Sequence, residues 1–379
     1  MISAEVLPPT FPLDTLRGDW NRLYDERARE PSLSFGWSFA MIRNHLVRRQ
    51  DWFTVLLRRS SRVVGIIPMV RTDRRLLGRT VTLLQPMQEK NNTHSDLLIS
   101  DYDPALLDAW LSATFTNGGR WDLLQMSRLL ENSPLCAALE QGLSRGHHAF
   151  ELSDQQPSYF LPLPRGYAEY LQARSAKFRS YLKRAEKKLQ ASGECGLDRV
   201  RATDDIDAAY RELLDIETSS WKHANGTAIS AVAHQTGFYR ELIESAQSAG
   251  TLHLTFLRID GRAVAHNLGV VVNDCYYYLK TSFREEHKAL GVATVARAWL
   301  IRELIADAVP HFDFPAEPYE WERQWTDETR WHRSLTLYNR TANAGLLRVI
   351  KRLRDMIRPR AGGRIVRHRD ARDLKGHDA

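Results

Sequence analysis

The residues whose types and spacing most clearly suit ligand binding or catalysis lie at 276–304. There an expected strand, a loop and a long helix follow one another. The start of a helix offers unpaired backbone N–H groups and the positive end of the helix dipole, which suit a pyrophosphate. Gly291 at this join would let a phosphate approach the backbone closely, and Arg284, His287 and Lys288 add positive charge nearby. The segment predicts an anion-binding loop, with an ordinary turn glycine as the alternative. The candidate binding residues are Lys288, Leu290, Gly291, Val292, Ala293 and Thr294.

The elements around this loop alternate between helix and strand. Residues 237–250 have the pattern of a helix, and 292–308 that of a longer one. Between them, β-branched and aromatic runs turn at Asp260-Gly261 and at Asn273-Asp274, which are favourable hairpin turns. The sequence HFDF then predicts a short strand after the second helix.

The first 150 residues show a similar mixture. LLRRSSRVVG at 56–65 aligns without a gap with FLRIDGRAVA at 256–265, with four identities in ten, although strand hairpins also resemble one another by composition. We therefore expect an α/β (α+β) protein with a tandem repeat, each lobe a mixed, mainly antiparallel sheet flanked by helices. The first half lacks an equivalent of the glycine loop, so we expect a non-catalytic lobe. The predicted domains are 1–155, 156–340 and a tail at 341–379.

A strongly basic helix is expected at 172–189, with seven Lys or Arg and one Glu between Arg174 and Lys188. Its apolar residues share one stripe: Phe178, Tyr181, Leu182, Ala185 and Leu189. The basic face is either solvated or meets an anionic substrate or the phosphates of a cofactor.

The net charge of +7 comes from the end of the chain, where 345–379 hold eleven Lys or Arg and four Asp. A nucleic-acid-binding protein usually carries its basic surplus on the folded domain, so we expect no DNA binding. Residues 345–360 have the pattern of a basic amphipathic helix, which would lie on an anionic membrane surface or pack on the protein, and the tail beyond Pro359 has the composition of a disordered segment.

Other patterns exclude further classes of protein. The three cysteines have no CxxC spacing, and the thirteen histidines have no paired-ligand spacing beyond the adjacent His147 and His148. We therefore expect neither disulfides nor a metal site. The sequence has no long apolar run and no recognisable signal peptide. We expect a cytoplasmic protein, in peripheral contact with the inner face of the membrane if the amphipathic helix binds lipid.

The glycine loop resembles the pyrophosphate loop of the GNAT superfamily, Gln/Arg-x-x-Gly-x-Gly/Ala, with Lys288 in the first position and Gly291 and Ala293 in the others. The runs FRSYLKRAEKKLQASG, IETSSWKHANG and HFDFPAEPY, with the strands between them, resemble the CelD-like acetyltransferase family over about 155 residues. That family is similar to the Fem-type transferases, which have two GNAT-like lobes. The chain departs from it after Phe314, where Pro315-Ala-Glu317 stands in place of the usual Leu-x-Gly.

The resemblance implies that an acetyl or longer acyl group passes from acyl-CoA to an amine, such as an amino sugar in polysaccharide or secondary metabolism, without a metal. This chemistry needs a base, an oxyanion stabiliser and a proton donor to the thiolate. The candidate catalytic residues are Asp313, Glu317, His266 and Tyr278. The candidates for binding the acceptor are Trp221, Lys222 and Lys280.

Each candidate has a structural alternative: a capping or Arg-bound Asp313, a solvated Glu317, a core His266, and packing roles for Tyr278 and Trp221. Two other functions are open: a Fem-type transferase that uses aminoacyl-tRNA, with RNA on the basic helix, and a non-catalytic scaffold held at the membrane by the tail. The sequence leaves the acceptor, the acyl chain and the oligomeric state undetermined.

Overall fold

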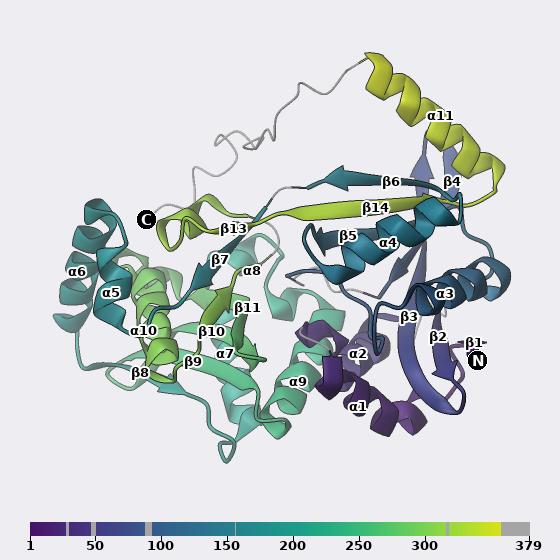
Figure 1. Ribbon diagram of the computed structural model, residues 1–379. Coiled ribbons are helices and arrows are strands. Elements are labelled where there is room, and N and C mark those ends of the chain that lie inside the picture. Colours follow the sequence, from purple (N-terminus) through teal and green to yellow (C-terminus); the bar gives the residue numbers. More distant parts are fainter. Residues whose placement is uncertain (28–29, 47–50, 88–92, 156, 316–317, 358–379) are drawn as a thin grey trace.

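The computed structural model describes residues 1–357 apart from 28–29, 47–50, 88–92, 156 and 316–317. Within these residues the chain forms two seven-stranded sheets, each flanked by helices (Figure 1). The predicted fold class is confirmed. None of the described helices has the length and apolar character needed to cross a membrane.

The first sheet has the order β1-β2-β3-β4-β5-β14-β6. Its strands are β1 (Ile2–Leu7), β2 (Trp52–Arg59), β3 (Arg62–Leu76), β4 (Arg79–Pro86), β5 (Leu123–Leu130), β14 (His332–Tyr338) and β6 (Ala149–Asp154). Neighbouring strands are antiparallel except β4 and β5, which pair in parallel through Leu83–Leu123 and Leu84–Leu124.

The second sheet repeats this arrangement in the order β8-β9-β10-β11-β12-β7-β13. Its strands are β8 (Cys195–Arg199), β9 (Leu252–Ile259), β10 (Arg262–Val272), β11 (Cys275–Phe283), β12 (His311–Asp313), β7 (Ser158–Pro162) and β13 (Thr329–Arg330). Again only the fourth and fifth strands, β11 and β12, are parallel. The turn residues Asp260, Gly261, Asn273 and Asp274 have positive φ, which confirms the two predicted hairpin turns.

The two lobes exchange one strand each. β6 and β7 follow one another in sequence, as do β13 and β14, yet the members of each pair lie in different sheets. β14 therefore lies in the first sheet, although its residues fall within the range 156–340 expected for the second domain. Where the exchanged strands pass each other, the hydroxyl of Ser158 and Nε2 of His332, both buried, lie 2.8 Å apart.

Helices cover both faces of each sheet. In the first lobe, α3 (Pro104–Asn117) and α4 (Pro134–Arg145) pack on one face, and α1 (Arg17–Arg27) and α2 (Phe35–Met41) on the other. In the second lobe, α5 (Tyr167–Gln172), α6 (Ala176–Gln190) and α10 (Val292–Ala306) cover one face, and α7 (Ile206–Thr218) and α9 (Ala233–Ser248) the other. Trp37, Ala40 and Met41 of α2 belong to the same apolar cluster as α9, so this cluster joins the lobes.

The final helix, α11 (Ala342–Ile357), follows β14 of the first sheet (Figure 1). It contacts this sheet through Ala344, which is buried, while Leu346, Val349 and Leu353 are exposed. The expected disordered tail lies outside the described residues.

Candidate active site

The glycine loop forms the predicted junction between a strand and a helix. A 3-10 turn, η5 (Glu285–Leu290), ends at Gly291, whose φ of +71° is in the left-handed region that glycine adopts without strain. α10 begins directly afterwards, and no side chain caps its N-terminus. Because the first N–H groups of a helix have no partner within it, this end of α10 offers donors to an anion.

All six predicted loop residues lie at this junction. Lys288 and Leu290 are in η5, Gly291 is the N-cap residue of α10, and its first turn holds Val292, Ala293 and Thr294. Val292 is buried in the core, so it offers its backbone rather than its side chain. The ammonium of Lys288 pairs with Glu285 at 3.2 Å.

The basic helix α6 lies directly against this loop. Nζ of Lys188 donates to the carbonyl oxygen of Ala289 at 2.6 Å. A Cβ placed on Gly291 would lie 3.4 Å from the hydroxyl of Tyr181. Lys177, Tyr181, Arg184 and Lys188 are exposed and share one face of α6 by their helical spacing. Three cations and Tyr181 therefore lie in a row beside the uncapped end of α10, and we name these four residues the α6 stripe.

The strand that leads into the loop has a free edge. β11 pairs with β12 only from Cys275 to Tyr277, and its later residues pair only with β10. The register of β10 against β11 shifts between Leu268 and Gly269, which lie opposite Lys280 and Tyr278 and leave Leu279 as an extra, bulged residue. Among the described residues, β11 and β12 thus stop pairing beyond Tyr277 and Asp313 and leave a notch on the way to Gly291.

Asp313 ends β12 and is buried, with 1% of its surface exposed. Its Oδ2 accepts a hydrogen bond from Nη1 of Arg330 at 2.9 Å, whereas its Oδ1 has no hydrogen-bond partner among the described residues. Burial raises the pKa of Asp313 to about 7, with Arg330 acting in the opposite direction. This carboxyl therefore changes its protonation state near neutral pH and has one oxygen free to accept a proton.

The first lobe adds two buried groups beside Asp313. Burial, and then the charge of Asp313, raise the pKa of Glu30 well above its usual value. Glu30 accepts a hydrogen bond from Thr93 at 3.1 Å, and Nδ1 of His94 lies 3.2 Å from the same oxygen. The ring of His94 lies 6.4 Å from that of Tyr277, the partner of Asp313 in the sheet. Sequence analysis missed these residues because the first half carries no recognisable motif.

Three other predicted residues meet around Glu217 of α7, a fully buried carboxylate that sequence analysis did not select. Oε1 of Glu217 lies 2.8 Å from Nζ of Lys222 and 3.7 Å from Nε2 of His266. Burial acts to raise the pKa of Glu217, but His266, Lys222 and Lys280 together hold it below its usual value. Burial lowers the pKa of His266, which favours the neutral ring.

This cluster ties α7 and α8 (Trp221–Ala224) to the sheet, since Nζ of Lys222 also donates to the carbonyl oxygen of Thr281 on β11. The ammonium of Lys280 lies 5.0 Å from the centre of the Tyr239 ring. Trp221 is half-buried at the start of α8. Glu317 lies outside the described residues.

Tyr278 lies on the opposite face of β11, under α10. Its hydroxyl donates to Oδ1 of Asn267 at 3.1 Å and accepts from Nη2 of Arg297 at 2.9 Å. The guanidinium of Arg297 lies 3.9 Å from the centre of the Trp321 ring. Tyr278 is the first residue of β11 beyond the pairing with β12, so it lies beside the notch.

Comparison with known proteins identifies the domain that contains this junction. Residues 176–323, which run from α6 past β12, match the family model described as an acetyltransferase (GNAT) domain. The protein therefore carries a GNAT acyltransferase domain. A search of curated proteins gives no match.

Solved structures resemble both lobes together at low sequence identity. The C-terminal domain of a putative lysylphosphatidylglycerol synthetase from Agrobacterium fabrum is 13% identical, with a TM-score of 0.54, and the match covers 89% of this chain and 96% of that one. FemX is 11% identical, with a TM-score of 0.54 and coverage of 84% and 94%. L-PGS from Bacillus licheniformis is 10% identical, with a TM-score of 0.54 and coverage of 92% and 98%. At these identities the likeness is one of fold.

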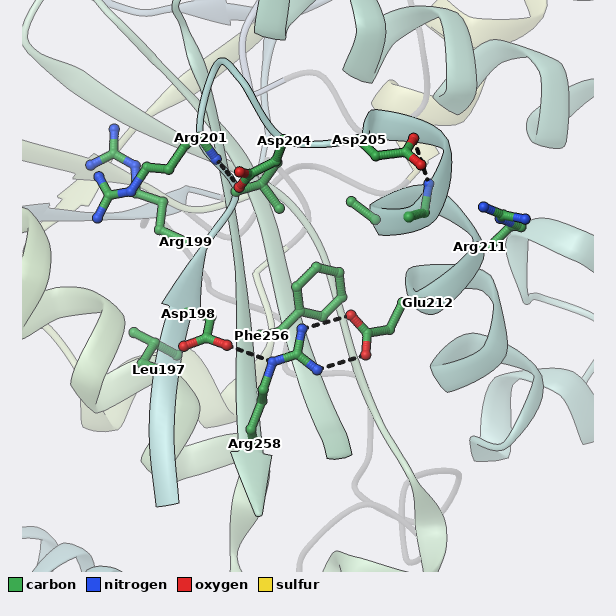
Figure 2. A pocket seen from close by; sticks show the side chains of 13 residues that line it. Leu197, Asp198, Arg199, Arg201, Asp204, Asp205, Arg211, Glu212, Phe256 and Arg258 are labelled. Atoms are coloured by element: carbon green, nitrogen blue, oxygen red, sulfur yellow. Dashed lines mark hydrogen bonds and ion pairs between the residues drawn. The ribbon is translucent and has the colours of Figure 1, made fainter. Parts of the chain in front are cut away.

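The GNAT domain also has an open polar pocket of about 820 Å³ at the β8 edge of its sheet (Figure 2). It lies along β8 and α7, and its central cation, Arg258, is bound by Glu212 through two hydrogen bonds of 2.7 and 2.8 Å. β8 is separated from β12 by three strands, which places the pocket roughly 19 Å from the notch at the usual strand spacing. None of the predicted site residues lines it.

Proposed function

We propose that the GNAT domain uses acyl-CoA as its donor and transfers an acetyl or longer acyl group to an amine. The supporting observation is the uncapped N-terminus of α10, with Gly291 in the left-handed region and the α6 stripe beside it. Helix donors and exposed cations at one place suit the phosphates of CoA. The notch between β11 and β12 leads away from this point and fits the extended arm that carries the thioester.

In this proposal Asp313 is the general base. Its free Oδ1 takes a proton from the acceptor ammonium, and the neutral amine then attacks the thioester carbonyl carbon. Backbone N–H groups at the bulge around Leu279 stabilise the oxyanion. As the C–S bond breaks, Tyr278 donates a proton to the thiolate, and the attacking nitrogen loses its second proton to solvent, which leaves an amide and a free thiol. Tyr278 is reprotonated from solvent and Asp313 releases its proton to solvent, so one proton is released per transfer.

The acceptor in this proposal is an amine, such as an amino sugar of polysaccharide or secondary metabolism. In its carboxylate form, Asp313 favours a cationic ammonium over an anion. Trp221, Lys222, Lys280 and His266 are proposed to shape the acceptor side of β11, and Glu317, which follows β12 in the sequence, is a further candidate. Lys222 acts there by positioning β11, because its ammonium is bound to Glu217.

A second candidate is a Fem-type transfer from aminoacyl-tRNA. It is favoured by the likeness to FemX over both lobes and by the exposed basic residues of α6, which would meet RNA phosphates. In the first candidate the first turn of α10 binds the phosphates of acyl-CoA, whereas the second candidate uses no CoA.

The substitution Ala293→Glu separates them. A carboxylate in the first turn of α10 interacts favourably with the helix dipole and competes with a phosphate for the same N–H groups. Calorimetry should show micromolar binding of acetyl-CoA or a longer acyl-CoA by the native protein and at least tenfold weaker binding by Ala293→Glu. The control Ala342→Glu makes the same change at the exposed start of α11 and should leave binding unchanged.

If the native protein binds no acyl-CoA, the proposed donor is wrong. Transfer of an aminoacyl group from charged tRNA, measured with the same preparation, would then support the second candidate.

We also propose that α11 contacts an anionic membrane surface, since Leu346, Val349 and Leu353 are exposed on a helix that carries Arg348 and Arg352. Flotation with vesicles containing anionic lipid tests this contact. Flotation that is unchanged by replacing the three apolar residues with Ser would contradict it.

A further inference from the structure

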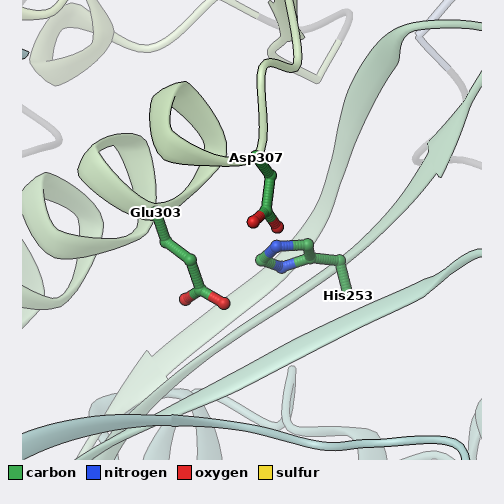
Figure 3. Close-up of side chains that lie close together, drawn as sticks. All are labelled: His253, Glu303 and Asp307. Carbon is green, nitrogen blue, oxygen red and sulfur yellow. The ribbon is translucent and has the colours of Figure 1, made fainter. Parts of the chain in front are cut away.

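One histidine and two acidic side chains converge at the C-terminal end of α10 (Figure 3). His253 comes from β9, Glu303 from the last turn of α10, and Asp307 directly follows that helix. Their ligand atoms all lie within 4.8 Å of one another, and no other such group of three occurs among the described residues. The four-residue spacing places Glu303 and Asp307 on one side of the helix.

His253 points to a ligand independently of the acids. Its side chain is fully buried, and neither ring nitrogen has a hydrogen-bond partner among the described residues. A buried polar group without a partner is costly, so such a group in a native fold needs an explanation. Figure 3 shows the ring beside the carboxylate of Asp307, with Glu303 pointing toward the same place from α10. An imidazole nitrogen is a common ligand of transition-metal ions in proteins.

We propose that His253, Glu303 and Asp307 bind a divalent transition-metal ion, with Zn²⁺ as the ion that best suits one imidazole and two carboxylates. Ligand atoms around such an ion lie about 3 to 4 Å apart, because each bond is about 2.1 Å long. Small rotations of the half-buried Glu303 and the exposed Asp307 would close the present separation. The exposure of Asp307 also gives the ion a path of entry.

Arg199 competes with the ion for the same carboxylates. Its Nη1 lies 2.5 Å from Oδ2 of Asp307 and 3.7 Å from Oε1 of Glu303. The negative end of the α10 dipole adds to the attraction for a cation at this point. Metal binding would therefore displace Arg199 from Asp307 and link β9 to the end of α10.

The site is separate from the acyl-transfer site. Glu303 is twelve positions beyond Gly291 along α10, or roughly 18 Å at the rise of an α-helix. Sequence analysis expected no metal because the histidines have no paired spacing, and this site needs only one histidine.

The test is a zinc titration of the untagged, full-length protein after removal of metals by a chelator, in competition with a chromophoric zinc indicator. The native protein should bind one equivalent and unfold at a higher temperature with Zn²⁺ than without it. Changes to groups that only support a ligand weaken metal binding by about 10- to 100-fold. His253→Gln and Asp307→Asn should each weaken it by at least that much and remove the thermal shift.

Two further variants sharpen the result. Arg199→Gln removes the competing cation and should tighten zinc binding, whereas weaker binding would contradict the competition. His148→Gln changes a half-buried histidine of the first lobe near Asp108 and should have no effect. Absence of zinc binding by the native protein, or equal binding by His253→Gln and Asp307→Asn, overturns the proposal. Asp307 is exposed, so its variant remains informative if His253→Gln fails to fold.

Discussion

The two lobes share one strand order but differ where their parallel strands meet and where the next long helix begins. In the first lobe the parallel pair consists of leucines, and α3 starts with Pro104 after Asp103, whose carboxylate caps it by accepting from the N–H of Ala105 at 2.9 Å. In the second lobe the pair ends with Tyr277 beside Asp313, and α10 starts after Gly291 without a side-chain cap. The same strand order can therefore carry a capped helix end or an uncapped one, and the proposed anion site depends on these few residues.

The first test of this comparison removes the acid that distinguishes the second parallel pair. Asp313→Asn should lower kcat for acyl transfer by about 10²- to 10⁴-fold, the range for loss of a general base. In the native protein kcat/KM should rise with pH up to about 7, because the Asp313 carboxylate is the active form and burial raises its pKa to about 7. A variant with full activity and the same pH profile would exclude Asp313 as the base.

The same substitution should change how stability depends on pH. The usual pKa of 3.8 applies to the unfolded chain, so between pH 4 and 7 the unfolded carboxyl loses its proton while the folded one keeps it. The free energy of unfolding of the native protein should therefore fall across this window, by an amount on the order of a few kcal/mol. Asp313→Asn should show a smaller fall in urea unfolding at pH 4, 5.5 and 7, and an identical fall would contradict the raised pKa.

A charge reversal tests whether the α6 stripe belongs to the anion site. Lys188→Glu should weaken acyl-CoA binding by about tenfold, because it places a negative charge next to the phosphates and removes the contact with Ala289. Lys187→Glu makes the same change at the neighbouring exposed position, which points away from the stripe, and serves as the control. Acyl-CoA affinity is measured by calorimetry at two salt concentrations. If Lys188→Glu and Lys187→Glu weaken it equally, binding depends only on the net charge of the protein and not on the α6 stripe.

The smallest expected effect is in the first lobe. Asp103→Ala removes the cap of α3 and should lower the free energy of unfolding by about 1 kcal/mol, the usual value for an N-cap. Acyl-CoA affinity should stay the same, because Asp103 and Pro104 lie in the first lobe and take no part in the loop at Gly291 of the second lobe. A marked change in affinity would show that the lobes are less distinct in function than their helix ends indicate.

Sequence analysis predicted the features that depend on neighbouring residues. The turns at Asp260-Gly261 and Asn273-Asp274, the glycine junction at Gly291 and the strand-helix order each follow from local backbone preference. It could not place Glu30 or Glu217, because a buried carboxyl is recognised only when residues from other elements surround it. The grouping of His253 with Glu303 and the crossing of β14 to the first sheet likewise depend on contacts over long stretches of chain.

The position of β14 delays completion of the first sheet during synthesis of the protein. Its partner β5 leaves the ribosome about 200 residues earlier, so the first sheet lacks the strand between β5 and β6 until nearly the whole described chain has been made. At roughly 5–20 residues per second, that interval is on the order of 10–40 s. During it, the facing edges of β5 and β6 are unpaired and open to association with other chains. A nascent first lobe is therefore a natural client for chaperones, and it can complete its sheet only after the second lobe has been synthesised.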